Sequence, residues 1–340
     1  MAMTIARPED AGPRPCDADA DADADAKAWA VGGEVMLDID LEACGRTALV
    51  LAYEGAGPAS TPLIVVAGGI SANRHVCGHA HDRAPGWWEV QAPTLGGARW
   101  LAIDWVGISD ELDVPITPAD QARALLALLD FLGIGAVSAF VGASYGGMVG
   151  MHFAHFAPQR CGALLAINAA HRTHPFVHAQ RALQRQAIEL GERLGDASAG
   201  VSLARKIAML SYRTPAEFER RFRDCPQLRG GRVTSAAETY LDEQGERHAR
   251  RMGAAAYRRL SESIDLHDIA PGAIAVKAIF AGTPDDRLIP LDDVRALATG
   301  APDACFATLP GGFGHDSFLK EQAAVAGLLS SFLSDNKVQR

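Results

Sequence analysis

Three residue types that could together carry out nucleophilic catalysis, a serine, an aspartate and a histidine, occur in suggestive contexts. Ser144 lies in Gly142-Ala143-Ser144-Tyr145-Gly146, which has the pattern G-x-S-x-G. An apolar, β-prone run at 136–141 precedes it and a helix-compatible run at 148–157 follows it. A serine on a tight turn between a strand and a helix exposes its hydroxyl at the end of the sheet, where a substrate can reach it. The pattern therefore predicts a nucleophile. The alternative is a glycine-rich turn before a buried helix.

The acid and the base follow the serine in chain order. Asp286 lies in a turn after an apolar strand expected at 274–280, and His315 lies in a glycine-rich loop after a strand expected at 305–309. A serine hydroxyl is a poor nucleophile unless a base takes its proton. We predict that His315 is that base and that Asp286 orients the imidazole and stabilises its cation. Asp285 is the competing carboxylate.

Acyl transfer through a serine also needs two hydrogen-bond donors for the oxyanion that forms on the substrate. The backbone N–H of Tyr145 directly follows the nucleophile. The second donor is expected in the loop after the strand at 63–67, where Gly69 lets the backbone of Ile70 approach a substrate. We therefore predict an oxyanion hole formed by Ile70 and Tyr145.

The elements that must position these residues alternate between strands and helices. Two apolar stretches between residues 28 and 52 predict an antiparallel pair. Buried strands are then expected at 63–67, 100–103, 163–167, 274–280 and 305–309, and helices at 118–132, 292–298 and 317–333. Short apolar strands alternating with helices predict an α/β fold with a mostly parallel sheet covered on both faces. This core would comprise residues 28–170 and 263–336.

The alternation stops between residues 171 and 262, where the pattern predicts helices with no strand between them. This span holds 17 of the chain's 32 lysines and arginines, so it is basic within an acidic protein. We interpret it as an inserted helical cap. Residues 1–27 end in Asp-Ala repeats, which offer nothing to bury and predict a disordered tail.

The composition narrows the function further. A net charge of −9 argues against binding of nucleic acid by the chain as a whole. No apolar run is long enough to cross a bilayer. The six cysteines form no C-x-x-C pair, and the N-terminus lacks a basic-then-apolar signal. These features favour a cytoplasmic protein that acts on small molecules.

A histidine-rich segment raises the question of a metal site. It contains His75, Cys77, His79, His81 and Asp82. The His79-Ala80-His81-Asp82 part is similar to metallohydrolase patterns, but these need a further histidine after the aspartate, and Arg83 stands there. We therefore expect no metal and no bound cofactor.

Several stretches together resemble the homoserine O-acyltransferases of methionine biosynthesis, a family with the α/β-hydrolase fold. The most specific are Pro85-Gly86-Trp87-Trp88-Glu89, similar to P-G-W-W-[DE], and Gly314-His315-Asp316-Ser317-Phe318-Leu319, similar to G-H-D-[AS]-F-L. The others are the loop at 69–76, the elbow at 144–148, Arg185-Gln186-Ala187-Ile188, and the stretch from Leu203 to Arg213. In order, these segments extend over about residues 63–320.

The resemblance implies roles for further residues. Ser144 would take an acyl group from acyl-CoA and pass it to the hydroxyl of L-homoserine. Arg205 would bind the acceptor's α-carboxylate with Tyr212 beside it, and Asp316 would meet the α-amino group. Arg205 and Tyr212 are seven residues apart, which places them on one helix face. The alternatives are a solvated cap arginine and, for Asp316, a helix N-cap.

The choice of acyl donor depends on departures from the family pattern. The loop after residue 103 is shorter than in the family, and Leu288 stands where succinyl-using members tend to carry arginine. We therefore expect acetyl-CoA as co-substrate. The alternatives are a succinyl-CoA-dependent homoserine or serine O-succinyltransferase, a capped esterase and a non-catalytic binding protein. Similar proteins commonly form a homodimer through the cap.

Overall fold

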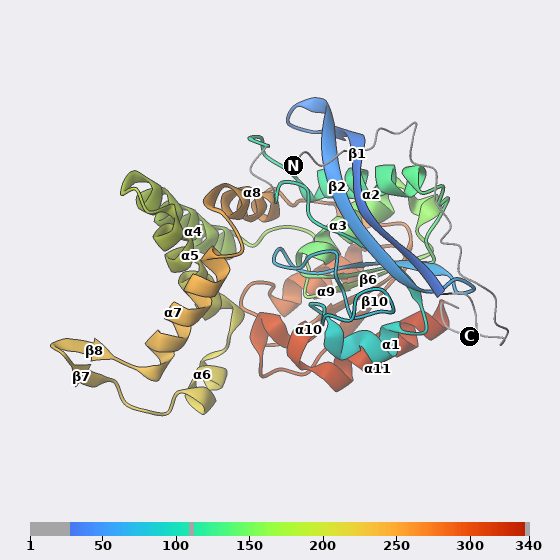
Figure 1. Cartoon of the computed structure of the whole chain (residues 1–340). Helices are drawn as coiled ribbons and strands as arrows, with labels where there is room; N and C mark the ends of the chain where they lie inside the picture. The colour runs from blue at the N-terminus through green and yellow to red at the C-terminus, as the bar shows by residue number, and fades with distance from the viewer. Residues whose placement is uncertain (1–27, 109–111, 337–340) are drawn as a thin grey trace.

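The computed structural model describes residues 28–108 and 112–336, so the predicted tail at 1–27 lies outside the described residues. One eight-stranded sheet organises the molecule, in the order β1-β2-β4-β3-β5-β6-β9-β10 (Figure 1). The strands are β1 (Ala28–Leu41), β2 (Gly45–Pro58), β3 (Leu63–Ala67), β4 (Arg99–Ile103), β5 (Ala139–Ala143), β6 (Ala163–Ile167), β9 (Lys277–Gly282) and β10 (Ala304–Thr308). β1 and β2 pair antiparallel, β2 meets β4 antiparallel, and the remaining pairs are parallel. The predicted α/β fold is confirmed.

Helices cover both faces of the sheet, and each face has its own hydrophobic core. The helices outside the cap segment are α1 (Ala92–Leu95), α2 (Pro118–Phe131), α3 (Tyr145–Phe156), α9 (Leu291–Gly300), α10 (Ser317–Lys320) and α11 (Gln322–Asp335). α2, α3 and α9 bury apolar residues on one face, and α1 and α11 do so on the other. None of the helices in the described ranges is long and apolar enough to span a membrane.

The helix predicted at 317–333 is interrupted. The backbone leaves the helical region at Glu321, where ψ is 59°, and the segment divides into α10 and α11. A continuous helix would pair the carbonyl of Phe318 with the N–H of Gln322. Here the indole Nε1–H of Trp88 donates to that carbonyl at 3.0 Å instead. The break thus anchors the Trp88 segment against the C-terminal part of the chain.

The segment between β6 and β9 projects to one side of the sheet (Figure 1). It consists of α4 (Pro175–Arg193), α5 (Ala197–Tyr212), α6 (Pro215–Arg221), β7 (Gln227–Arg229), β8 (Arg232–Thr234), α7 (Ala236–Ala249) and α8 (Ala254–Asp265). The prediction that this span contains no strand is wrong, because β7 and β8 form an antiparallel hairpin. Gly230 and Gly231 make its turn with φ of 58° and 77°, values that suit glycine. The division of the chain into core and cap insertion remains our interpretation.

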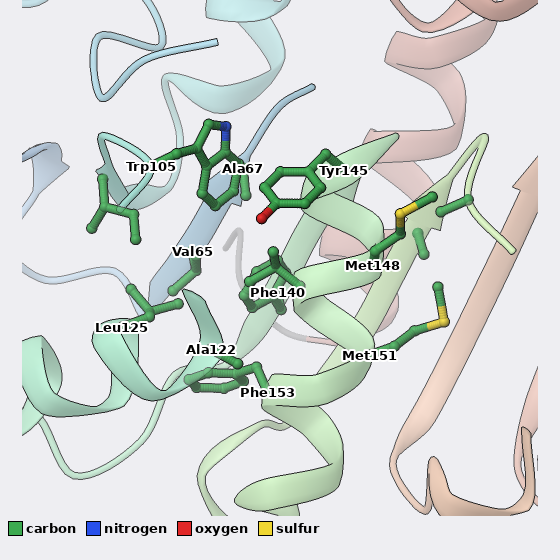
Figure 2. Packing of buried hydrophobic residues seen from close by; sticks show 14 of the residues in the cluster. Val65, Ala67, Trp105, Ala122, Leu125, Phe140, Tyr145, Met148, Met151 and Phe153 are labelled. Carbon is green, nitrogen blue, oxygen red and sulfur yellow. The ribbon is translucent and has the colours of Figure 1, made fainter. Parts of the chain in front are cut away.

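Tyr145 links the start of α3 to this segment. Its ring meets Trp105 edge to face, with centroids 4.9 Å apart, in a core that includes Phe140 and Met148 (Figure 2). Its hydroxyl lies 2.6 Å from Oγ of Ser263 on α8. Burial raises the pKa of the Tyr145 phenol, so the hydroxyl stays neutral. The residue next to the predicted nucleophile is therefore held in place by packing and by hydrogen bonding of its buried hydroxyl.

Candidate active site

Ser144 occupies a sharp turn between β5 and α3, with φ of 53° and ψ of −120°. Few non-glycine residues adopt a positive φ, so neighbouring contacts must hold the serine in place. A Cβ at Gly142 would lie 2.4 Å from the Gly146 carbonyl oxygen, and one at Gly146 would lie 2.2 Å from that of Ala67. The glycines of the G-x-S-x-G pattern are thus needed for close backbone packing around the turn.

The structure brings the three residues of the predicted triad together. His315 Nε2 lies 2.8 Å from Ser144 Oγ, and His315 Nδ1 lies 2.7 Å from Asp286 Oδ2. The other carboxylate oxygen of Asp286 accepts the backbone N–H groups of Leu288 and Ile289 at 2.8 and 3.0 Å. Asp286 and His315 are both buried. This arrangement can pass a proton from the serine hydroxyl to the imidazole while the aspartate fixes the ring.

Asp285 takes a different part in the site. Its Oδ2 accepts the backbone N–H of Gly312 at 2.6 Å, which ties it to the loop that carries His315. Of the two adjacent carboxylates, Asp286 is therefore the one that contacts the imidazole.

The charge of Asp286 controls the protonation of His315. Burial alone lowers the pKa of His315, but the Asp286 carboxylate and its hydrogen bond more than offset this, and the net pKa lies above 6.5. Burial raises the pKa of Asp316, although the neighbouring charges of Arg213 and His315 oppose that rise. The imidazolium that forms when His315 takes a proton is thus stabilised in a site largely closed to water.

Asn168 supports the histidine loop and was not anticipated from the sequence. Its backbone has φ of 49°, and its side-chain amide donates to the His315 carbonyl at 3.1 Å. The side-chain oxygen Oδ1 of Asn168 accepts a hydrogen bond from the Thr283 hydroxyl at 3.1 Å. Asn168 follows β6 directly, but an asparagine after a strand is too common to have indicated this contact.

The predicted oxyanion donors lie beside Ser144. A Cβ on Gly69 would be 3.8 Å from the serine Cβ, and Ile70 lines the same pocket. The loop is fixed by Gly146 N–H donating to the Gly68 carbonyl and by Trp105 Nε1–H donating to the Gly69 carbonyl. Within the described residues, the N–H groups of Ile70 and Tyr145 have no protein acceptor. Both are therefore available to a developing negative charge.

A cavity of about 180 Å³ lies above Ser144. All of the substrate-binding residues implied by the resemblance line it. Its walls include Ile70, Trp87, Ser144, Arg181, Gln184, Arg205, Tyr212, Tyr257, Leu288, His315, Asp316 and Phe318. The cavity is mostly apolar, with a few charged groups placed at its edges, which is the usual makeup of a small-molecule site.

Two arginines bring positive charge to this cavity. The guanidinium of Arg205 lies over the ring of Tyr212 at 5.1 Å, and it forms no ion pair within the described part of the chain. Arg181 contacts Asp265 at 2.6 Å, but Asp265 also pairs with Arg185 at 2.7 Å. Arg181 thus shares its one carboxylate partner with Arg185 and is only partly neutralised by it.

Asp316 already has a partner from the cap segment. Its carboxylate pairs with Arg213 at 3.0 Å, and Arg213 also pairs with Glu217 at 3.0 Å. Asp316 stands at the N-cap position of α10, but its side chain makes no capping hydrogen bond. The N-cap alternative therefore holds for the position of Asp316 but not for a capping role of its side chain, and Asp316 lines the cavity.

Comparison with known proteins finds a matching family model and similar sequences. A family model described as alpha/beta hydrolase fold matches residues 62–321. The chain is 45% identical to "Homoserine O-succinyltransferase" of Xanthomonas campestris pv. campestris, over 89% of this chain and 84% of that relative. It is 38% identical to "Homoserine O-acetyltransferase" of Thermus thermophilus, over 64% of this chain and 58% of that relative.

Solved structures agree on the fold. A homoserine O-acetyltransferase from Staphylococcus aureus has a TM-score of 0.75 and 24% identity, covering 90% of this chain and 95% of its own. Esterase E22 has a TM-score of 0.79 and 18% identity, covering 90% of this chain and all of its own. At these identities the likeness concerns the fold alone, since the same fold carries both transferases and esterases.

Proposed function

The chain belongs to the homoserine O-acyltransferase family of the alpha/beta-hydrolase fold, and we propose that it moves an acyl group from acyl-CoA to the hydroxyl of L-homoserine. The observation that carries this proposal is the hydrogen-bonded series Ser144, His315, Asp286 at the floor of a cavity that also holds Arg205 without an ion-pair partner among the described residues. An esterase needs only the hydrogen-bonded triad, whereas a transferase with an amino-acid acceptor also needs a cation such as Arg205 to bind the acceptor's carboxylate.

The first half-reaction acylates the enzyme. His315 Nε2 takes the proton of Ser144 as its oxygen attacks the thioester carbonyl of acyl-CoA. The N–H groups of Ile70 and Tyr145 bind the oxyanion of the tetrahedral intermediate. When the C–S bond breaks, the CoA thiolate leaves with the proton from His315, and the acyl group remains as an ester on Ser144.

The second half-reaction transfers the acyl group. His315 takes the proton of the homoserine hydroxyl, whose oxygen attacks the ester carbonyl in the same oxyanion hole. Collapse of this intermediate breaks the bond to Ser144, and His315 returns the proton to the serine. O-Acylhomoserine leaves the site with the enzyme restored. Water must stay out of the cavity for transfer to prevail over hydrolysis, and the apolar walls support this.

Two charged side chains bind the α-carboxylate and the α-ammonium group of the acceptor. The planar guanidinium of Arg205 can form two parallel hydrogen bonds to an α-carboxylate. The Asp316 carboxylate is the acidic group available to an α-ammonium, and Arg213 holds it in position. L-Serine has the same α-carboxylate and α-ammonium groups but a shorter side chain. The distance between Arg205 and Ser144 therefore determines which acceptor can bring its hydroxyl to the acyl group.

For the donor we propose succinyl-CoA. The relative that matches the chain at 45% identity is named a succinyltransferase. Arg181, which lines the cavity and shares its partner Asp265 with Arg185, also supplies positive charge that suits the distal carboxylate of a succinyl group.

Acetyl-CoA is the second candidate donor, and a specific feature favours it. Leu288 is buried and lines the cavity, whereas the neighbouring Arg287 is exposed. An apolar side chain at this position gives no partner to a succinyl carboxylate. The sequence-based expectation of acetyl-CoA rests on this same residue.

The function is tested by measuring thiol release from succinyl-CoA and from acetyl-CoA, each with L-homoserine, with L-serine or with no acceptor. We expect sustained CoA release, beyond the one equivalent per chain that accompanies acylation of Ser144, only with succinyl-CoA and L-homoserine together, and O-succinylhomoserine by mass spectrometry. Equal release with and without any acceptor would indicate a hydrolase. A preference for acetyl-CoA would overturn the donor assignment and leave the acyltransferase intact.

We also propose that two copies associate through the cap segment. α4 exposes Phe176, Leu183 and Leu190 at seven-residue spacing, and α5 exposes Leu203 and Leu210 at the same spacing. Seven residues are two helical turns, so each set forms an apolar stripe, and two such helix pairs can bury their stripes in one bundle. Light scattering should give twice the chain mass, and Leu183→Glu together with Leu190→Glu should give the monomer.

Because acyl-CoA is an intracellular metabolite, we place the protein in the cytoplasm.

A further inference from the structure

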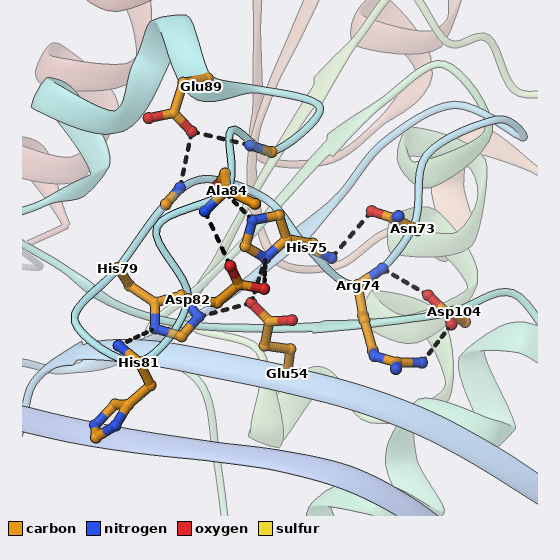
Figure 3. A network of polar contacts seen from close by, with 12 residues as sticks. Glu54, Asn73, Arg74, His75, His79, His81, Asp82, Ala84, Glu89 and Asp104 are labelled. Carbon is orange, nitrogen blue, oxygen red and sulfur yellow. Dashed lines mark hydrogen bonds and ion pairs between the residues drawn. The ribbon is translucent and has the colours of Figure 1, made fainter.

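A second group of ligand-type side chains lies outside the lining of the candidate active site. Glu54 comes from β2, and His75 and His79 come from the loop between β3 and α1 (Figure 3). Glu54 Oε1 lies 2.7 Å from His75 Nδ1 and 2.8 Å from His79 Nε2. All three atoms lie within 4.8 Å of one another. Two imidazoles from one loop thus converge on a single carboxylate oxygen of a neighbouring strand.

We propose that Glu54, His75 and His79 bind a divalent transition-metal ion of the Zn²⁺ class. Two histidine nitrogens and one carboxylate oxygen form a common protein ligand set for this ion. The Asp82 carboxylate, 3.9 Å from His75 Nδ1, points toward the same centre and is a candidate for a fourth ligand (Figure 3). This set balances the charge of the ion with carboxylates and leaves both histidines neutral.

The scaffold already holds the ligands in place. Glu54 lies on a strand paired on both sides, opposite Gly32 of β1 and Ala102 of β4. The His79 ring packs edge to face on Trp100, with centroids 5.9 Å apart. His75 Nε2 lies 2.7 Å from the Ala84 carbonyl and donates its hydrogen there, so Nδ1 is the nitrogen that can bind metal once its own proton is displaced. A ring N–H donated to a backbone carbonyl is the usual support of a metal-binding histidine.

Binding requires only small movements. Ligands at about 2.0–2.2 Å from a Zn²⁺ ion lie roughly 3.3 Å apart, so the nitrogens move away from Glu54 Oε1 by about 0.5 Å and toward each other from a separation of at most 4.8 Å. The ion replaces the hydrogens through which both rings now contact Glu54. His75 gives up the Nδ1 proton, and His79 moves its proton to Nδ1, which costs only the 3.3 Å contact with His81 N–H. The three side chains are 13–15% exposed, so solvent reaches the centre.

The ion would connect β2 to the loop that shapes the active site. This loop starts just after Ile70 and ends at Trp87, and both line the catalytic cavity. Glu89 already binds the N–H groups of Gly78 and Gly86 within it. The metal adds a link on the far side of the loop and touches none of the reacting groups, so its role is to stabilise the loop.

Zinc binding to the full chain tests this proposal without reference to acyl transfer. Chelator-treated protein is titrated with Zn²⁺ by calorimetry, and thermal unfolding is followed with and without the ion. We expect one bound ion per chain, a rise of several degrees in Tm at saturation, and at least about tenfold weaker binding in His79→Gln. His81→Gln is the matched control, because the His81 ring points away from the centre (Figure 3).

Glu54→Gln provides a second variant that keeps the size of the side chain and one acceptor oxygen. It should also bind Zn²⁺ at least about tenfold more weakly, with an unchanged far-UV circular dichroism spectrum. Absence of saturable binding in the wild-type chain would overturn the proposal. So would wild-type affinity in both His79→Gln and Glu54→Gln, because the ion would then bind elsewhere. Neither result would affect the proposed transferase chemistry.

Discussion

The ring of Tyr212 stacks on the imidazole of His315, with centroids 5.8 Å apart and planes inclined by 25°. The guanidinium of Arg205 lies over the same tyrosine ring at 5.1 Å. Tyr212 is the last residue of α5, whereas His315 follows β10 at the end of the sheet. One aromatic ring therefore connects the proposed acceptor-binding arginine of the cap segment to the proposed base of the core.

Replacing Tyr212 should separate the part played by its ring from that of its hydroxyl. Tyr212→Phe keeps both stacking contacts and should keep kcat/KM for homoserine within about twofold, whereas Tyr212→Leu should lower it about tenfold. Steady-state kinetics with saturating acyl-CoA measures both. A Phe variant as impaired as the Leu variant would show that the hydroxyl, and not the stack, is what matters.

Removing the charge of Arg205 should weaken acceptor binding specifically. A hydrogen-bonded charge pair contributes about 2–3 kcal/mol, so Arg205→Gln should raise KM for homoserine by roughly 30- to 150-fold. Hydrolysis of p-nitrophenyl acetate, which has no carboxylate, should be unchanged. Lys206→Gln is the control, since Lys206 pairs with Asp242 and does not line the cavity. Equal loss of both activities in Arg205→Gln would mean that Arg205 supports the fold and not the acceptor.

The adjacent carboxylates Asp285 and Asp286 should differ sharply. Asp286→Asn removes the charge that orients and stabilises the His315 cation, and kcat should fall by about 10³-fold or more. Asp285→Asn keeps an oxygen that can accept the Gly312 N–H, so its kcat should stay within about tenfold of the wild-type value. Rapid-quench measurement of the acylation step compares the two. Similar losses in both variants would contradict the assignment of Asp286.

The pH profile should reflect the raised pKa of His315. The base works only when neutral, so activity is lost as pH falls through its pKa, and the acidic limb of kcat/KM should have its midpoint above 6.5. Asp286→Asn lowers that pKa, because the charge that raises it is gone. The residual activity of this variant should therefore extend to lower pH. A wild-type midpoint at or below 6.5 would indicate that burial outweighs the effect of Asp286.

The parts of the site that the sequence predicts are those encoded in short, contiguous patterns. Glycines on both sides of Ser144 are required by backbone contacts within a few residues of it. Asp286 and His315 each follow an apolar strand, and the ends of parallel strands meet at one edge of the sheet. Their convergence therefore follows from the strand pattern, and the structure decides between the neighbours Asp285 and Asp286 by the 2.7 Å contact of Asp286 with His315.

The supporting contacts could not be predicted because they join residues far apart in the chain. Asn168 reaches His315 across 147 positions, and Glu54 reaches His75 across 21. The pairing of Arg213 with Asp316 depends on how the cap segment sits on the sheet, which no local pattern encodes. The sequence does not predict the β7–β8 hairpin because its three-residue strands are almost wholly exposed and too short for an alternating pattern to repeat; the Gly230-Gly231 pair is its clearest signal.

The central claim is that acyl transfer proceeds through an ester on Ser144. Intact-protein mass spectrometry after mixing the enzyme with excess acyl-CoA, and no acceptor, tests it most directly. We expect one added acyl group per chain, located on the peptide containing Ser144, absent in Ser144→Ala, and lost within one turnover when L-homoserine is added. An enzyme that forms O-acylhomoserine without this adduct, or a Ser144→Ala variant that still transfers acyl groups at the wild-type rate, would contradict the mechanism.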